Sequence, residues 1–227
     1  MALPLAGKHC VVVGATGVIG FSIAKAFSHQ GAVISLLGRS VLDARPRLEP
    51  QLRPYSLPGT DADTPSAHQF IRLDASNRDE IKAVFSPRGS SKSFVGPIDI
   101  LVNCAGISQT TLLKRTPDEE LSSIVDTNLL ATMLVCKHAK MRPNGCIINV
   151  SSLMATKGGL GATAYAASKA GVVGFTRALC LEMASRSIRV NALLPGWVNS
   201  SMWTARNPAS LSQRYSPQQS GRSHRGC

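Results

Sequence analysis

Six short apolar runs recur along the chain, and helix-like stretches separate most of them. The runs are rich in β-branched residues, which is typical of buried strands, and they cover residues 8–13, 32–37, 69–73, 98–103, 145–151 and 187–193. Strands that alternate with helices predict a parallel sheet with helices on both faces. We therefore expect a single α/β domain with a doubly wound, Rossmann-type parallel sheet, whose ligand lies at the carboxyl ends of the strands.

Two polar stretches interrupt this alternation. Residues 43–68 contain five prolines, a density that precludes a regular helix through much of the segment. Residues 86–96 are rich in serine, glycine and lysine. We predict surface insertions after the second strand and before the fourth. Solvated loops are favoured, and lids or partner sites stay open as alternatives.

A glycine-rich turn follows the first predicted strand. Gly14, Gly17 and Gly20 stand between the apolar residues 10–13 and the helix-like run 21–27. Glycines in this place allow a tight turn and let a pyrophosphate approach the helix N-terminus, where N–H groups and the helix dipole favour an anion. A tight turn without a ligand is the alternative. The position in a strand–turn–helix unit favours a dinucleotide site.

The end of the second predicted strand bears on the choice of dinucleotide. An acidic residue there would hydrogen-bond the adenosine ribose of NAD, but the sequence has Arg39 and Ser40 after Gly38. A guanidinium group suits a 2′-phosphate, so the sequence favours NADPH. The alternative is an ordinary surface arginine.

Tyr165 and Lys169 lie four residues apart, and Ser152 precedes the tyrosine by thirteen residues. Residues at i and i+4 of a helix share a face, so the ammonium group would favour ionisation of the phenol. A serine hydroxyl that reaches the same point could hold a carbonyl oxygen. The three groups suit carbonyl reduction or alcohol oxidation. For the pair alone, an ordinary amphipathic helix is the alternative.

Further motifs accompany these groups in order along the chain: residues 14–20, Asp74, and residues 103–106, 128–130, 149–152, 165–169 and 195–198. Together they resemble the short-chain dehydrogenase/reductase superfamily over about residues 6–202. The chain is most similar to the β-ketoacyl-acyl-carrier-protein reductases and their carbonyl-reductase relatives, through residues 112–116, 128–130, 171–179 and 188–191.

The resemblance implies a catalytic tetrad of Ser152, Tyr165, Lys169 and Asn128. Tyr165 would protonate the carbonyl oxygen, and Ser152 would position and polarise it. Lys169 would tune the tyrosine and hold the nicotinamide ribose. Asn128 would bind a water that links Lys169 to solvent.

The resemblance also implies contacts with NADPH, the expected form of the NADP cofactor. Asp74 would contact the adenine, residues 103–106 would run beneath the cofactor, and residues 195–202 would cover the nicotinamide. The complete predicted set is Gly14, Thr16, Gly17, Ile19, Gly20, Arg39, Ser40, Asp74, Asn103, Ala105, Gly106, Tyr165, Lys169, Pro195, Gly196, Val198 and Ser200. Two features depart from the family pattern: Gly17 follows Gly14 by three residues rather than four, and Cys104 replaces an asparagine.

The charge balance changes the expected partners. The 227 residues carry a formal net charge of +12, from 25 basic and 13 acidic residues. Nucleic acid is disfavoured as a partner, because 5% aromatic content offers no base-stacking platform. An acidic carrier protein is the expected alternative, and the family likeness makes Arg142 and Arg186 candidates for its docking. Arginines in the last 25 residues explain part of the excess without any partner.

The six cysteines show no metal-ligand spacing, so no metal site is expected. Most lie in apolar runs, which is typical of small buried residues in a reducing compartment. We find no signal peptide and no apolar run long enough for a membrane span. The predicted location is cytoplasmic or mitochondrial.

The last residues differ from the rest of the chain. Residues 208–227 consist mainly of serine, glutamine, arginine, glycine and proline, a composition that cannot bury enough surface to order itself. We predict a dinucleotide-binding domain over residues 1–203 and a basic, unstructured tail over 204–227. Members of the family continue with a further helix and a seventh strand, which the tail would replace. The sixth strand would then be an open edge, and the family's homo-oligomer becomes doubtful.

The leading hypothesis is NADPH-dependent reduction of 3-oxoacyl thioesters carried on acyl carrier protein, as in fatty acid biosynthesis. Reduction of quinones or small carbonyls is the alternative within the enzyme class. From another class, the chain would be a catalytically impaired, truncated product that binds only nucleotide or a partner.

Overall fold

The computed structural model describes residues 3–55, 63–86, 94–109, 111–200 and 202. The chain divides into two units, residues 1–196 and residues 197–227. All strands of the described residues belong to the first unit. The predicted tail, residues 204–227, lies outside the described residues, as do residues 56–62 and 87–93 of the two insertions.

Strands and helices alternate along the first unit as the apolar pattern predicts. In chain order the elements are β1 His9–Val13, α1 Val18–His29, β2 Val33–Gly38, α2 Val41–Leu48, η1 Glu49–Gln51, β3 Gln69–Arg72, α3 Arg78–Phe85, β4 Ile98–Asn103, η2 Leu113–Arg115, α4 Asp118–Val125, η3 Asp126–Leu130, α5 Ala131–His138, β5 Met141–Val150, α6 Met154–Lys157, α7 Thr163–Met183, η4 Ala184–Arg186 and β6 Arg189–Leu193.

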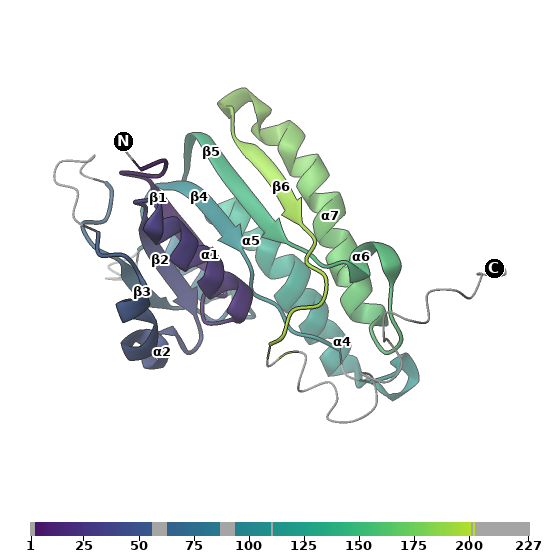
Figure 1. Ribbon diagram of the computed structural model, residues 1–227. Helices are drawn as coiled ribbons and strands as arrows, with labels where there is room; N and C mark the ends of the chain where they lie inside the picture. Colours follow the sequence, from purple (N-terminus) through teal and green to yellow (C-terminus); the bar gives the residue numbers. More distant parts are fainter. Residues whose placement is uncertain (1–2, 56–62, 87–93, 110, 201, 203–227) are drawn as a thin grey trace, which may run out of the picture. The chain divides into compact units, whose positions relative to one another are not determined.

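The strands form one parallel sheet in the order β3-β2-β1-β4-β5-β6 (Figure 1). The chain crosses from the edge strand β3 back to the centre at β4, beside β1. In open α/β sheets, ligands bind at such a switch point, outside the carboxyl ends of the strands. The predicted fold class is confirmed.

Two apolar layers hold helices against the sheet. Successive strand residues point to opposite faces, so Val11 and Val13 pack on one side of β1 and Cys10 and Val12 on the other. The first layer receives α3, α5 and α7. The second receives α1 and α2. The helices therefore leave the carboxyl edge of the sheet open for loops.

The fifth strand begins four residues earlier than predicted. Asn144 has a left-handed φ of 61°, and a Cβ on Gly145 would lie 2.9 Å from the backbone oxygens of both Arg142 and Asp99. The register shifts at this point, between Ile98 and Ile100. The strand continues through an irregularity that interrupts its apolar pattern, which is why the pattern alone predicted a later start.

The proline-rich insertion begins with a helix, α2, which the sequence did not predict, and its described residues from 52 onward contain no helix. Pro46 lies inside α2. Val41 and Leu48 at the two ends of the helix are fully buried, and Arg45 pairs with Glu49 four residues on. Apolar burial at both ends outweighs the hydrogen bond that Pro46 cannot make.

Strand β6 lies at one edge of the sheet. Its Val190 is 7% exposed against the α7 layer, whereas Leu193 is 45% exposed. No helix in the described part of the chain is long and apolar enough to cross a membrane.

Candidate active site

The glycine turn after β1 is packed against the loop after β4. Gly14 has a φ of +84°, and a Cβ there would lie 2.5 Å from the backbone nitrogen of Ala105. A Cβ on Gly20 would lie 2.3 Å from the oxygen of Gly14. Both glycines are therefore required by the packing of the protein itself.

Gly17 is different, because it is exposed and a Cβ there would meet only the Gly14 oxygen at 3.6 Å. It is the N-cap of α1, which has no side-chain cap hydrogen bond and no acidic residue in its first turn. The first-turn N–H groups and the helix dipole thus favour an anion at this point. A pyrophosphate fits the turn, and Gly17 is where its close approach would matter.

Two of the side chains expected at the adenosine end, Arg39 and Ser40, are exposed. Arg39 and Ser40 directly follow β2 at its carboxyl end, and β3 pairs beside it through Gly38 and Arg72. Asp74 follows β3. The charges of Arg39 and Arg72 both act on the Asp74 carboxylate. The three side chains therefore lie near one another at the carboxyl ends of β2 and β3.

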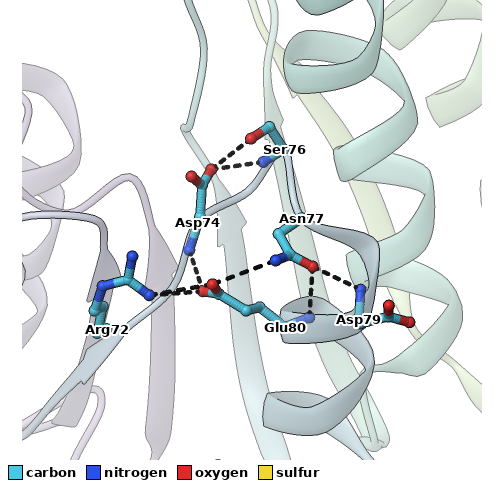
Figure 2. A network of polar contacts seen from close by, with 6 residues as sticks. All are labelled: Arg72, Asp74, Ser76, Asn77, Asp79 and Glu80. Atoms are coloured by element: carbon cyan, nitrogen blue, oxygen red, sulfur yellow. Dashed lines mark hydrogen bonds and ion pairs between the residues drawn. The ribbon is translucent and has the colours of Figure 1, made fainter.

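Asp74 is held in a polar network (Figure 2). Its Oδ1 accepts hydrogen bonds from the Ser76 nitrogen at 2.9 Å and the Ser76 hydroxyl at 2.7 Å. Partial burial would raise the pKa of Asp74, but these hydrogen bonds and the two arginines bring that pKa below its ordinary value. The carboxylate is ionised and fixed in orientation.

Glu80 anchors the backbone of the same turn, a role the sequence did not reveal. Its carboxylate accepts the Asp74 N–H at 2.9 Å and pairs with Arg72 at 3.1 Å (Figure 2). Asn77 caps α3 by accepting the N–H groups of Asp79 and Glu80. The adenine-side loop is thus tied to both β3 and α3.

The loop after β4 divides the predicted cofactor contacts into two kinds. The Asn103 side chain points into the core, where it donates to Asn149 at 2.9 Å and to the Cys136 sulfur at 3.3 Å. It joins β4 to β5, and the contact of Asn103 with cofactor stays a prediction. Ala105 and Gly106 lie beyond it, with Ala105 against the Gly14 turn.

Gly106 is where two members of the predicted tetrad meet. A Cβ on Gly106 would lie 3.1 Å from the Asn128 Oδ1 and 3.3 Å from the Lys169 Nζ. A larger residue would therefore force the two side chains away. The absence of a side chain at Gly106 permits this close approach.

Asn128 lies in η3, a single π-helical turn between α4 and α5. It is fully buried. Its Oδ1 accepts the Ile107 N–H at 2.8 Å, and its Nδ2 donates to the Ile107 oxygen at 3.0 Å and the Ser168 hydroxyl at 3.1 Å. Turns of this kind are frequent at functional sites. Here the turn joins the β4 loop to α7.

Lys169 is 4% exposed on α7. Its Nζ donates to the Val150 oxygen at 2.9 Å and lies 5.9 Å from the centre of the Tyr165 ring. Burial lowers the pKa of Lys169 to about 8, partly offset by the Cys104 thiol. The lysine can therefore exchange its proton close to neutral pH.

Ser152 and Tyr165 complete the tetrad. Ser152 follows β5, two residues beyond the carbonyl that Lys169 binds, and its hydroxyl accepts the Met154 N–H at 3.1 Å. Tyr165 lies in the first turn of α7, half-buried, one turn before Lys169. Lys169 thus connects the loop after β4, at Gly106, with the carboxyl end of β5, at Val150.

The residues from 8 to 210 match the family model described as "short chain dehydrogenase". The chain belongs to the short-chain dehydrogenase family. The 3-oxoacyl-[acyl-carrier-protein] reductase FabG of Chlamydia muridarum is 36% identical over 203 residues, which are 87% of this chain and 77% of that protein. Carbonyl reductase family member 4 of Danio rerio is 36% identical over 198 residues, or 86% and 77%.

A solved structure similar to this short-chain dehydrogenase supports the same assignment. A single-residue variant of actinorhodin polyketide ketoreductase, crystallised with NADPH, superposes with a TM-score of 0.72 at 30% identity. The match covers 86% of this chain and 72% of that one. The family assignment therefore stands on sequence and on structure.

Two further residues support the dehydrogenase site, and neither was among the predicted site residues. The Ser151 hydroxyl donates to the Lys169 oxygen at 2.7 Å, and the Ser168 hydroxyl donates to the Tyr165 oxygen at 2.7 Å. Serine is too common for either to be noticed in the sequence. Only the folded arrangement shows that they fix the helix that carries Tyr165 and Lys169.

The predicted nicotinamide cover divides between the two units. Pro195 belongs to the first, where its oxygen accepts the Leu153 N–H at 2.9 Å, directly beside Ser152. Gly196 follows it. Val198 and Ser200 belong to the second unit, so their contacts with cofactor stay a prediction.

The arginines considered for carrier docking lie at the other end of the sheet. Arg142 is at the start of β5, a strand of ten residues that spans about 30 Å before Ser152. It donates to Asp99 at 3.3 Å and to Thr64 at 3.1 Å, and Arg186 donates to the Met141 oxygen. Both are held in internal contacts, which does not support the docking role.

Proposed function

We propose that this chain reduces 3-oxoacyl thioesters with NADPH, the thioester being carried on acyl carrier protein. The observation that carries the proposal is the meeting of Asn128 and Lys169 at Gly106. The Lys169 Nζ also lies 5.9 Å from the centre of the Tyr165 ring and binds the Val150 oxygen, two residues before Ser152. The glycine turn after β1 would hold the pyrophosphate. Relatives 32–36% identical bear the name 3-oxoacyl-[acyl-carrier-protein] reductase, which supports the thioester as substrate.

Cofactor binding follows from the amino-terminal half of the sheet. The first turn of α1 would hold the pyrophosphate at Gly17, and Asp74 would accept from the adenine. Arg39, exposed at the end of β2, would bind the 2′-phosphate by charge-assisted hydrogen bonds. No acidic residue at that position opposes the phosphate.

When bound, the nicotinamide supplies the hydride that reaches the carbonyl carbon. The protein's own residues bind and protonate the carbonyl oxygen. Ser152 donates a hydrogen bond to it, and Tyr165 transfers its hydroxyl proton to it, so that the carbonyl becomes an alcohol. Lys169 stabilises the tyrosinate that remains. With a pKa of about 8, most Lys169 side chains are in the charged ammonium form at neutral pH.

The surroundings of the site favour a substrate with an apolar part. Leu112 and Leu113, after β4, are 47% and 52% exposed, and Leu153 and Leu160, after β5, are 39% and 74% exposed. A Cβ on Gly161 would lie 3.7 Å from the Thr111 oxygen, so the two loops adjoin. The acyl chain that extends from the substrate carbonyl would contact these leucines.

Reduction of quinones or small carbonyls is the second candidate, because a relative of equal identity is named a carbonyl reductase. Loss of NADPH absorbance with an acetoacetyl thioester and, separately, with a quinone distinguishes the two. The proposal expects kcat/KM to be higher for the thioester, and Ser152→Ala to lower both. A rate with quinone alone would contradict the thioester assignment.

A further inference from the structure

Gln109 is fully buried between the loop after β4 and the start of α7. Its side-chain amide makes hydrogen bonds in two directions. The Oε1 accepts N–H groups of the first turn of α7, and the Nε2 donates to residues 111 and 116 and, at 3.3 Å, to the Thr163 hydroxyl. Glutamine is mostly exposed in proteins, so a fully buried one with so many partners is there for its hydrogen bonds.

The first turn of α7 takes its cap from this distant residue. The N-cap residue, Ala162, makes no side-chain cap hydrogen bond. The Gln109 Oε1 accepts the N–H of Ala164 at 2.8 Å and, at the longer distance of 3.5 Å, the N–H of Tyr165. These are the second and third residues of the helix, whose N–H groups a capping side chain ordinarily satisfies.

The nitrogen of the same amide holds the loop that faces the helix. It donates to the Thr111 oxygen at 2.9 Å and to the Thr116 hydroxyl at 3.1 Å. One carboxamide therefore ties the start of α7 to the segment that carries the exposed leucines Leu112 and Leu113. A methionine has the same reach but neither function.

Tyr165 is thus fixed on both sides of its own backbone. Its N–H lies toward Gln109, and its carbonyl accepts the Ser168 hydroxyl at 2.7 Å. Ser168 in turn accepts from Asn128. The turn of helix that aims the tyrosine is held by buried polar side chains from two other segments.

We propose that Gln109 is a positioning residue for Tyr165, which acts by capping the first turn of α7 from the β4 loop. The inference rests on the proposed function, since it assigns Tyr165 the proton transfer. Gln109 need not touch substrate. Loss of the cap lets the first turn fray, and the tyrosine hydroxyl then spends less time in line with the carbonyl oxygen.

The test compares Gln109→Met with Thr116→Val in the full chain. The first removes the cap. The second removes the Thr116 hydroxyl, with its hydrogen bonds to the Gln109 Nε2, the Thr111 hydroxyl and the Leu112 oxygen, and leaves the cap. We expect Gln109→Met to lower kcat about tenfold, because the free energy of a helix cap is about as large as that of a tenfold change in rate. The Kd for NADPH should not change. Thr116→Val should keep kcat within about twofold.

Amide hydrogen exchange measured by NMR reports the cap without any substrate. Exchange at Ala164 and Tyr165 should accelerate in Gln109→Met and not in Thr116→Val. Gln109→Glu keeps an oxygen acceptor at the helix N-terminus, where a negative charge is favourable, and should restore protection of both amides.

Equal losses of kcat in the two variants, or unchanged exchange in Gln109→Met, would overturn the inference. If the unaltered chain turns over neither thioester nor quinone, the proposed function fails. The exchange result then still decides whether Gln109 holds the backbone of Tyr165. The two failures are therefore distinguishable.

Discussion

The two halves of the sheet build the site in different ways. Around β1 and β2 the site is shaped mainly by backbone atoms, because Gly14 and Gly20 allow segments of the chain to pack in direct contact. The charged side chain of Arg39 is exposed there. Around β4, β5 and α7 it is side chain: Asn128, Lys169 and Ser168 are buried and hydrogen-bonded. A nucleotide needs a shaped surface, whereas a proton transfer needs fixed polar groups in a dry place.

The largest effect should come from the backbone half, with Gly20→Ala. Its Cβ would lie 2.3 Å from the Gly14 oxygen, so the turn must move. We expect unfolding free energy to fall by about 3 kcal/mol or more, with loss of NADPH binding. Gly17→Ala is the matched control and should change unfolding free energy by less than about 1 kcal/mol. Chemical denaturation measures both, and equal effects would contradict the packing argument.

In the side-chain half, Lys169→Met should change how the free energy of unfolding depends on pH. Burial lowers the pKa of Lys169 from 10.5 to about 8. Between these values the unfolded chain binds more protons than the folded one, so the unaltered protein gains stability as pH rises through this window. Below pH 8 the buried charge destabilises it by at most about 3 kcal/mol.

Lys169→Met should therefore be the more stable protein near pH 7 and lose that advantage as pH approaches 10.5, while its turnover is lost. Urea unfolding across the range measures this. Lys157→Met changes an exposed lysine on α6 and should show a flat difference. A flat difference for Lys169→Met as well would show that the buried charge does not act as described.

A smaller effect is expected at the exposed adenosine end. Arg39→Asp should shift the preference between NADPH and NADH toward NADH by about ten- to a hundredfold, because it replaces a phosphate-binding cation with an anion. Arg47→Asp makes the same charge change at the far end of α2. Ratios of kcat/KM for the two cofactors should move only in the first variant, and a shift of equal size in both would point to net charge alone.

The smallest effect concerns the cap of α3. Asn77→Ala removes the acceptor of two N–H groups, at 3.0 and 3.1 Å, and should lower unfolding free energy by about 1 kcal/mol. Turnover at saturating NADPH should not change. A thermal scan with an activity assay checks both, and an unchanged midpoint would mean that water replaces the asparagine without loss.

Much of the backbone half was predictable, because its signals are local. β1, its glycine turn and α1 form one continuous stretch of sequence, and the ends of β1, β2 and β4 fall within one residue of prediction. α2 was not predicted, since the burial of Val41 and Leu48 that supports it depends on contacts with the sheet. The number of prolines in the segment carries no information about those tertiary contacts.

The side-chain half was predictable only where a family motif marked it. Asn128 and Lys169 were expected and meet at Gly106, with the Tyr165 ring near Lys169. Ser152 follows the carbonyl that Lys169 binds by two residues. Gln109 and Glu80 were not expected, because their partners lie 55 and 6 residues away and no periodicity connects them. Asn103 was expected to run beneath the cofactor, which stays a prediction. Its side chain holds β4 to β5, a direction that only the folded structure reveals.

The central claim is that Tyr165 moves the proton while the glycine half binds the nucleotide. Tyr165→Phe tests it most directly, by measuring turnover with an acetoacetyl thioester and, on the same sample, the Kd for NADPH by fluorescence. The account predicts that kcat falls by about a thousandfold and that Kd stays within about twofold. A variant that keeps its turnover, or that loses nucleotide binding together with it, would contradict the account.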